Sequence, residues 1–286
     1  MDDYGHWPQC RKAIDEFFVD ANITLHTIDF TGRYFQKKNV DVRIPAPYMG
    51  AFQHDSRVKE NWETLNKWHE QTVKKYVGHV GTNRFQAYRY MEAIRHTIQA
   101  RKKESGSGKA VRINVCETGF NGGHSAMLFL SFLNKTENVH VSYYGWDLKR
   151  VGSASPTADK MAEIFRDYFH ITWGDSKLTL KNAKDVLQGQ SCDLIVVDGE
   201  HTAAGFRSDL KHFLEVARPG AVVFGDDCAP YKKENREIPL MKAAYMEFVE
   251  RKEIIPVANY RNPYLPSPGF VEGVVPGKDG EYKLGI

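Results

Sequence analysis

The sequence predicts an α/β fold, namely a doubly wound, mostly parallel sheet preceded by an N-terminal helical cap. From residue 111 onward, short apolar runs alternate with segments of helical periodicity, which is typical of parallel strands joined by crossover helices. Four of these runs are followed by an acid, namely Glu117, Asp147, Asp198 and Asp226. In a doubly wound sheet the carboxyl ends of the strands share one edge, where ligands bind. We therefore expect these acids to lie around one ligand site.

Length and composition limit the classes of protein to consider. The chain has 286 residues, of which 42% are hydrophobic and 26% are charged, as in ordinary globular proteins. A net charge of +3 is not the basic excess of a typical nucleic-acid binder. No apolar run approaches the roughly 20 residues that span a membrane. We therefore expect neither nucleic acid nor membrane as a partner.

A polar, glycine-rich stretch at 101–109 predicts a flexible boundary. We expect a mainly helical cap or lid at residues 1–105 and a Rossmann-like core at residues 106–286. In the cap, apolar spacing predicts amphipathic helices at about 56–76 and about 83–101, whereas residues 31–55 are interpreted as irregular. Six aromatic residues of the cap can line a substrate site, although core packing explains most of them equally well: Tyr34, Phe35, Tyr48, Phe52, Trp62 and Trp68.

The core elements are expected in alternation. Strands are predicted at 111–116, 139–146, 170–173, 192–197, 221–224, 254–260 and 270–275, and helices at 157–168, 178–187, 205–217 and 238–251. The last two strands are joined by a proline-rich segment, residues 262–268, which can reach the mouth of the site. We expect these two strands to form an antiparallel edge pair.

A glycine-rich turn follows the first core strand. Gly119 and Gly123 allow the backbone to approach a ligand closely, and Asn121 tolerates a left-handed conformation better than most residues. This pattern predicts a nucleotide-binding turn between a strand and a helix. For the loop alone, a turn that merely needs glycine is the alternative interpretation.

Asp147 and the pair Asp175 and Ser176 follow the next two strands. A carboxylate at Asp147 can accept hydrogen bonds from both ribose hydroxyls of a nucleoside, and it can equally be a helix cap or a solvated loop acid. Asp175 and Ser176 can meet an adenine edge or can be ordinary turn residues.

Asp198, Asp226 and Asp227 form a second group, because they follow strands that are expected to be neighbours. Three converging carboxylates suit a hard divalent cation such as Mg²⁺, although Asp226 and Asp227 can also be simple turn acids. His201 lies three residues after Asp198. Its imidazole titrates near neutral pH and can take a proton from a substrate hydroxyl, or it can be an ordinary loop histidine.

These motifs resemble those of class I S-adenosylmethionine-dependent methyltransferases, over about residues 110–275. The closer resemblance is to the metal-dependent catechol, sugar and macrolide O-methyltransferases. Glu117-Thr118-Gly119, Gly123 and Ser125-Ala126 fall on the pattern E-x-G-x-x-x-G-x-S-A of that group. The resemblance implies that Ser125 and nearby backbone hold the methionine carboxylate and that Asp147 holds the ribose.

The resemblance implies S-adenosylmethionine and Mg²⁺ or another divalent cation as cofactors. The implied cofactor-binding residues are Glu117, Gly119, Phe120, Asn121, Gly123, Ser125, Asp147, Asp175, Ser176 and Asp198. The implied metal ligands are Asp198, Asp226 and Asp227, and the implied catalytic residues are His201 and Asp198. Asp147 is often Glu in the catechol branch, Asp227 is often Asn there, and His201 falls where catechol enzymes carry a lysine. The proton acceptor and the substrate are therefore left open.

The expected function is transfer of a methyl group to a hydroxyl of a small molecule. A metal-independent small-molecule N-methyltransferase, a cofactor-binding module without turnover and a dinucleotide enzyme on the same fold are the alternatives. A small-molecule acceptor is the expected partner, and a homodimer is left open. Cys116 and Cys192 lie in apolar runs and are interpreted as small core residues, while the polar N-terminus does not resemble a signal peptide. We therefore expect a reducing, cytoplasmic setting.

Overall fold

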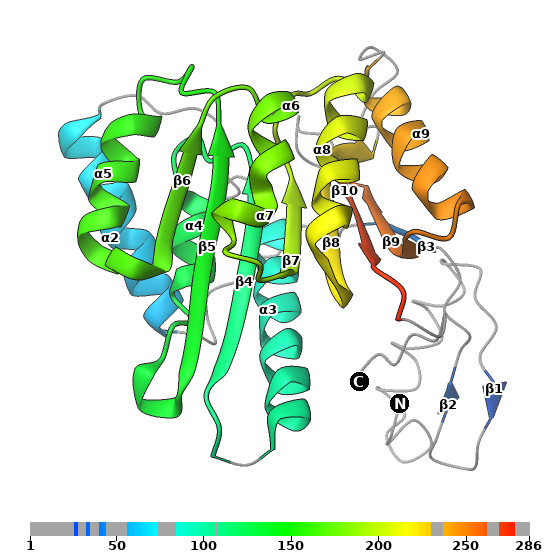
Figure 1. Cartoon of the computed structure of the whole chain (residues 1–286), viewed down its shortest axis with the longest axis horizontal. Helices are drawn as coiled ribbons and strands as arrows, with labels where there is room; N and C mark the ends of the chain where they lie inside the picture. The colour runs from blue at the N-terminus through cyan, green and yellow to red at the C-terminus, as the bar shows by residue number, and fades with distance from the viewer. Residues whose placement is uncertain are drawn as a thin grey trace.

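The computed structural model describes residues 26–27, 33–34, 40–43, 56–73, 84–106, 108–229, 237–261 and 269–277. Within these residues the chain forms an eight-stranded sheet with helices on both faces (Figure 1). Two short antiparallel strands, β1 (His26–Thr27) and β2 (Arg33–Tyr34), form a separate sheet.

The large sheet is mostly parallel, as predicted. From one edge to the other its strands are β3 (Val40–Arg43), β9 (Ile255–Arg261), β10 (Gly269–Val274), β8 (Ala217–Ala229), β7 (Cys192–Val197), β4 (Val111–Thr118), β5 (Val139–Asp147) and β6 (Phe169–Trp173). Only β10 among them runs antiparallel to its neighbours, β8 and β9. Every residue of β7 is buried, and so is every residue of β4 except Arg112. Such strands need helices on both faces.

The helices form two layers, one on each face of the sheet (Figure 1). One layer contains α2 (Ser56–Thr72), α3 (Arg84–Ser105), α4 (His124–Leu130) and α5 (Ala154–Phe165), and the other contains α6 (Ser176–Thr179), α7 (Ala183–Val186), α8 (Ala203–Val216) and α9 (Glu237–Glu250). A single helix was expected at 178–187, but this segment is broken into α6, a 3-10 turn at Leu180–Asn182 and α7. None of the helices in the described ranges is long and apolar enough to cross a membrane.

The two N-terminal helices pack directly on the sheet. Val58 and Leu65 of α2 and Met91 and Ile94 of α3 are buried in the same hydrophobic core as strands β4 and β5. α2 lies against α4, and α3 lies against β4, α4 and β7. The expected helices at 56–76 and 83–101 are therefore present, and they share one core with the sheet.

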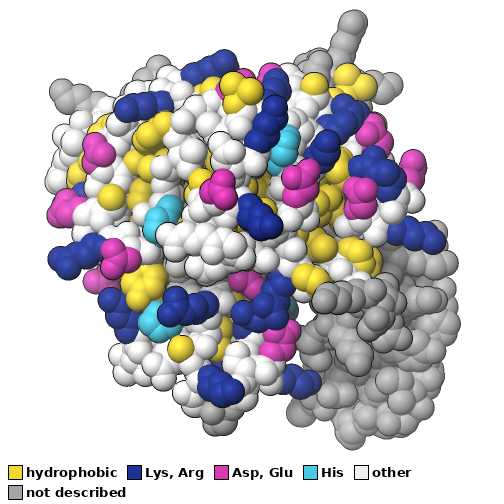
Figure 2. All heavy atoms as spheres, viewed as in Figure 1, with side chains coloured by type: hydrophobic (Ala, Val, Ile, Leu, Met, Phe, Trp, Pro, Cys, Tyr) yellow, Lys and Arg dark blue, Asp and Glu magenta, His cyan; other side chains and the backbone are white. Residues whose placement is uncertain are grey.

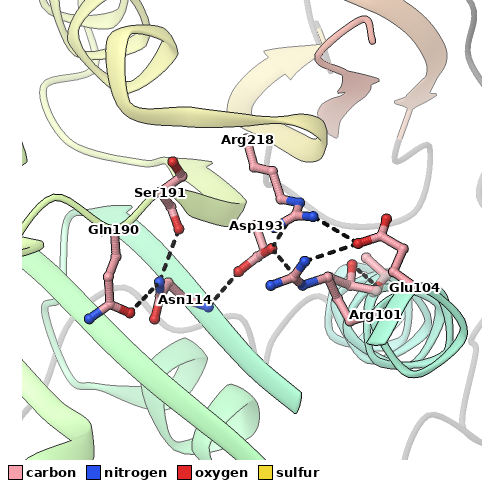
Figure 3. A network of polar contacts seen from close by, with 9 residues as sticks. Arg101, Glu104, Asn114, Gln190, Ser191, Asp193 and Arg218 are labelled. Carbon is pink, nitrogen blue, oxygen red and sulfur yellow. Dashed lines mark hydrogen bonds and ion pairs between the residues drawn. The ribbon is translucent and has the colours of Figure 1, made fainter. Parts of the chain in front are cut away.

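Helix α3 extends farther than the sequence predicts. The stretch 101–109 was interpreted as a flexible boundary, yet residues up to Ser105 are helical. Arg101 forms an ion pair with Asp193 of β7, and both Arg101 and Arg218 donate hydrogen bonds to Glu104 (Figure 3). These charged side chains hold the last turn of α3 against the sheet, so a polar composition did not indicate a loop here.

The edge of the sheet also differs from the prediction. β9 and β10 do form an antiparallel pair, but β3 lies outside them and pairs with β9 in parallel. β3 belongs to residues 31–55, which were interpreted as irregular. A four-residue strand gives little periodicity, and its partner is more than 200 positions away in the chain, so local sequence carried no signal for it.

The interpretation of Cys116 and Cys192 as separate core residues requires a correction. Cys116 of β4 and Cys192 of β7 are joined by a disulfide with a Cα–Cα distance of 5.9 Å, whereas they were interpreted as separate core residues. They lie 76 positions apart in the sequence and meet only because β4 and β7 are neighbouring strands. Cys228 is a buried free thiol. The cytoplasmic setting, which was inferred partly from these cysteines, stays a prediction.

The surface of the described part carries charges of both signs. Lys and Arg lie interspersed with Asp and Glu on the face seen in Figure 2, with a few apolar side chains between them.

Candidate active site

A cavity of about 320 Å³ opens at the carboxyl ends of β4, β5, β6 and β7. It is lined by residues that end these strands and by the loops that follow them, including Gly119, Asp147, Ser176 and Asp198. In Figure 1 this is the end toward which the arrows of β5 and β6 point. The strand-end acids were expected at this edge, and two of the four, Asp147 and Asp198, line the cavity.

The glycine turn lies against the loop after β7. Gly119 has a φ of 91°, and a Cβ there would lie 1.9 Å from the carbonyl oxygen of Asp198. Gly123 caps α4 with a φ of 70°, where a Cβ would lie 2.8 Å from the ring of Phe120. Asn121 is left-handed, with a φ of 51°. Both glycines therefore serve close packing, Gly119 against the loop after β7 and Gly123 against Phe120 and Thr157.

Asp147 connects the second core strand to the glycine turn. Its carboxylate accepts hydrogen bonds from the backbone N–H of Asn121 at 3.0 Å and of Lys149 at 2.6 Å. Because Asp147 also lines the cavity, its carboxylate has a direct route to a ligand. The position at the end of β5 is the one from which an acid can bind ribose hydroxyls.

Glu117 lies beneath the cavity and does not line it. It is buried, and it accepts hydrogen bonds from the hydroxyls of Tyr143 and Ser125, the latter at 2.7 Å. Burial raises the pKa of Glu117 to about 8, and the two hydroxyl donors only partly oppose this increase. Ser125, expected to hold the methionine carboxylate, here donates its hydroxyl to Glu117.

Asp226 and Asp227 lie in a bulge within β8, and not at its end as predicted. The strand continues to Ala229, and its register against β10 shifts opposite these residues. Asp227 has a left-handed φ of 53°. A bulge changes the direction of successive side chains and is common beside active sites. Here it turns the two neighbouring carboxylates toward different partners.

The acid cluster comprises Asp198, Asp226, Asp227 and His201. His201 Nδ1 lies 2.5 Å from Asp227 Oδ2, and His201 Nε2 lies 3.6 Å from Asp198 Oδ1. Asp226 and Asp198 are hydrogen-bonded to each other. Burial raises the pKa of both Asp198 and Asp226, and so does the negative charge of their neighbours. The hydrogen bond to Asp227 raises the pKa of His201, although desolvation opposes it.

A further acid supports the floor of the cavity. Asp209 of α8 is buried, close to Gly199, Thr118 and Ser176, all of which line the cavity. Burial raises the pKa of Asp209 to about 6. At the rim, Asp175 caps α6 by accepting the N–H of Lys177 at 3.0 Å.

The structure divides the expected cofactor residues into two groups. Those that line the cavity are Gly119, Asn121, Asp147, Asp175, Ser176 and Asp198, and those that lie behind it are Glu117, Phe120, Gly123 and Ser125. Phe120 packs on the rings of Tyr143 and Phe169. The expected catalytic residues His201 and Asp198 both line the cavity.

The cavity fits an adenosyl ligand. Asn121 Oδ1 and Trp146 Nε1 are buried without a hydrogen-bond partner among the described residues, and both residues line the cavity. An unpartnered buried polar group is costly, so a ligand that supplies a donor and an acceptor there would be favoured. Asp147 adds a carboxylate suited to vicinal hydroxyls.

The acid cluster has the donor atoms that a metal ion needs, but these atoms are not arranged as a ligand set. Asp198, Asp226 and Asp227 offer the oxygen donors that a hard cation prefers, and their crowding would be relieved by a positive charge. In the described ranges, however, no group of three or more His, Cys, Asp and Glu side chains is arranged to hold a metal ion. The carboxylates are instead paired with His201, with each other and with Gln86.

Some site residues were not predicted from the sequence. Gln86 and Tyr90 of α3 approach the acid cluster, and Tyr143 of β5 holds Glu117. The signal available for Gln86 was a polar residue on the apolar face of a helix, four positions before Tyr90. Of the expected substrate aromatics, Trp62 is buried against His124, with a ring distance of 4.8 Å. The side chains of Tyr34, Phe35, Tyr48 and Phe52, and the segment 262–268, lie outside the described residues.

Comparison with known proteins agrees with this site. Residues 116–228 match the model of a methyltransferase domain. This range begins at the end of the first core strand and ends just after Asp226 and Asp227, so it contains the cavity and the acid cluster. No curated protein matches the chain in sequence.

Solved structures share the fold at low sequence identity. An O-methyltransferase from Bacillus cereus in complex with SAH is 13% identical, with a TM-score of 0.53, over 77% of this chain and 91% of that one. The O-methyltransferase TomG from Streptomyces achromogenes, in complex with SAM, is 16% identical, with a TM-score of 0.51, over 80% and 95%. The SAH-bound methyltransferase PaMTH1 from Podospora anserina is 15% identical, with a TM-score of 0.51, over 81% and 97%.

The family match, the strand order and the ligand cavity at the strand ends agree with one another. Residues 116–228 therefore match a methyltransferase domain, within a fold that solved methyltransferases share.

Proposed function

We propose that the protein transfers a methyl group from S-adenosylmethionine to a hydroxyl group of a small molecule. One observation carries this proposal: Asp198 and His201 line the cofactor cavity and also belong to the acid cluster. A hydroxyl placed at the cluster would lie beside the cavity, with proton acceptors in reach. The O-methyltransferases among the solved structures of this fold support the choice of oxygen.

The residues of the site would have separate roles in binding the cofactor, orienting the acceptor and accepting the proton. Asp147 and Asn121 would hold the adenosyl group, and the acid cluster would orient the acceptor hydroxyl. His201 would accept the hydroxyl proton when its imidazole is neutral. Because a methyl transfer needs little covalent chemistry from the protein, correct positioning of donor and acceptor is the main contribution.

A divalent cation is the second part of the proposal. Asp198, Asp226 and Asp227 would hold it, and when bound it would lower the pKa of the acceptor hydroxyl. The support is the donor set. Three carboxylates are crowded together, and burial and neighbouring negative charge raise the pKa values of Asp198 and Asp226, so a positive charge beside them would be favourable.

The first test is calorimetric titration with S-adenosylhomocysteine. We expect saturable binding that Asp147→Ala weakens about tenfold or more, since a hydrogen bond to a charged group is lost. Asp159→Ala, an exposed acid of α5, is the matched control and should leave binding unchanged. No binding by the folded wild-type protein would refute the cofactor pocket.

The second test measures transfer of a radiolabelled methyl group to a panel of phenols, sugars and amines, with and without chelator. Methylated hydroxyls and loss of transfer on chelation are the expected results, and Asp226→Ala should abolish metal-stimulated transfer. Methylated amines with no effect of the chelator would instead favour a metal-independent N-methyltransferase. Cofactor binding without transfer to any acceptor would favour a binding module.

A further inference from the structure

Helix α3 reaches the acid cluster through one side chain. Gln86 Nε2 lies 2.7 Å from Asp226 Oδ1 and 2.8 Å from the hydroxyl oxygen of Tyr90. Gln86 is only 5% exposed and Tyr90 only 2%. A side-chain amide has two N–H hydrogens, so both contacts can be made at once. The contact between Gln86 and Asp226 joins residues that are 140 positions apart in the sequence.

The geometry fixes which end of the amide faces the carboxylate. An ionised carboxylate only accepts hydrogen bonds, so Gln86 must present its nitrogen to Asp226. Tyr90, one helical turn later on the same face of α3, holds the amide in that orientation. Tyr90 therefore fixes the orientation of the Gln86 amide that contacts Asp226.

The two consecutive acids of the β8 bulge are held by side chains from different elements. Asp226 is held by Gln86 of α3 and by Asp198, and Asp227 is held by His201 from the loop after β7. Gln86 is the neutral donor among these contacts, whereas the other side chain that holds Asp226 is a second carboxylate, that of Asp198. A lysine or arginine at position 86 would orient Asp226 as well, but it would also neutralise it. A neutral amide orients the carboxylate and leaves its negative charge available.

We propose that Gln86 is a positioning residue that orients the Asp226 carboxylate toward the acceptor, with Tyr90 holding Gln86 in place. This inference rests on the proposed function in so far as Asp226 acts on the acceptor. It assigns a role in the reaction to a helix that lies before the matched methyltransferase domain.

The test compares Gln86→Leu with Gln99→Leu, which removes an exposed amide from the same helix. We expect Gln86→Leu to lower kcat for methyl transfer about ten- to a hundredfold, as small errors of position do in active sites. The dissociation constant for S-adenosylhomocysteine should change less than twofold, because Gln86 does not line the cofactor cavity. Gln99→Leu should leave kcat and cofactor binding unchanged.

Tyr90→Phe removes only the oxygen that holds Gln86, so it probes the same chain of contacts with little risk to folding. We expect kcat to fall about fivefold, the effect of one lost hydrogen bond. The double variant Gln86→Leu/Tyr90→Phe should resemble Gln86→Leu alone, because Tyr90 acts through Gln86. Additive losses, or an equal loss in cofactor affinity, would indicate a merely structural role and overturn the inference.

Crystal structures of the variants give a readout that does not depend on turnover. The Asp226 carboxylate should change its orientation in Gln86→Leu and keep it in Gln99→Leu. An unchanged Asp226 in Gln86→Leu would overturn the inference even if the proposed function held. Conversely, a wild-type protein that transfers no methyl group would refute the function, while the orientation of Asp226 would still decide the role of Gln86.

Discussion

At the scale of single residues, His201 links the acid cluster to the pH dependence of the reaction. Its pKa is raised above the ordinary value, mainly by the hydrogen bond to Asp227. Only the neutral imidazole can accept a proton, so we expect kcat/KM for the acceptor to rise with pH, with an inflection above the ordinary histidine pKa of about 6.5. His201→Ala should lower kcat/KM by about a hundredfold or more and remove the inflection. A pH–rate profile measures both effects.

Asp227→Asn tests whether Asp227 is the cause of the raised pKa of His201. With the charged partner of His201 removed, the inflection should move down toward the ordinary pKa. His96→Ala, an exposed histidine of α3, is the control and should leave the profile unchanged. If Asp227→Asn loses activity without moving the inflection, Asp227 serves the cluster in another way and His201 is not the proton acceptor.

At the scale of elements, α3 is fastened to the sheet at the end opposite the active site. Asp193, 5% exposed, accepts the N–H of Asn114 at 2.9 Å and lies 3.5 Å from Arg101 and 4.0 Å from Arg218 (Figure 3). Asp193→Ala would leave buried donors without their acceptor, so we expect it to lower the free energy of unfolding by about 2–4 kcal/mol. Urea denaturation measures this loss, and cofactor affinity should not change.

Glu137→Ala provides the comparison. Glu137 is 63% exposed and lies 3.5 Å from Lys102, so its loss should cost less than about 1 kcal/mol. Equal effects of the two substitutions would show that the network around Asp193 does not stabilise the packing of α3.

The elements that the sequence predicted well are those with a local signal. β4, β5 and β7 are long or apolar enough to be found from their composition, and α8 from its periodicity. β3 and the last turn of α3 were missed because they depend on partners distant in the chain, β9 and Asp193. The disulfide between β4 and β7 was missed for the same reason, since its spacing has meaning only once the strand order is known.

The site residues that could be predicted are likewise those with a local sequence signal. Asp147 and Asp198 were placed at the cavity because an acid after a parallel strand lies at the edge where ligands bind. Gln86 could not be assigned, because a glutamine in an amphipathic helix does not reveal what it contacts. The bulge at Asp226 and Asp227 arises from the pairing of β8 with β10, which local sequence does not encode.

At the scale of the whole molecule, the active site affects the stability of the fold. Burial raises the pKa of Glu117 to about 8 and of Asp209 to about 6, and it also raises those of Asp198 and Asp226. All four shifts have the same sign. The folded protein therefore binds more protons than the unfolded chain between about pH 4 and pH 8. Its free energy of unfolding should be greatest at the acidic side of this range and should fall as the pH rises.

Glu117→Gln tests this linkage in the cofactor-free protein. A neutral amide still accepts hydrogen bonds from Tyr143 and Ser125, but it has no charge to bury. Between the ordinary glutamate pKa of 4.5 and its folded pKa of about 8, Glu117 keeps a proton that the unfolded chain releases, so the wild-type protein loses stability over this range and the variant avoids the loss. We expect the variant to be more stable by up to a few kcal/mol at pH 8.5 and nearly equal at pH 5. Urea denaturation at both values measures the difference, with the exposed Glu60→Gln as control. If the difference does not grow with pH, Glu117 is already ionised in the folded state, so that its negative charge is available beneath the cofactor cavity at neutral pH.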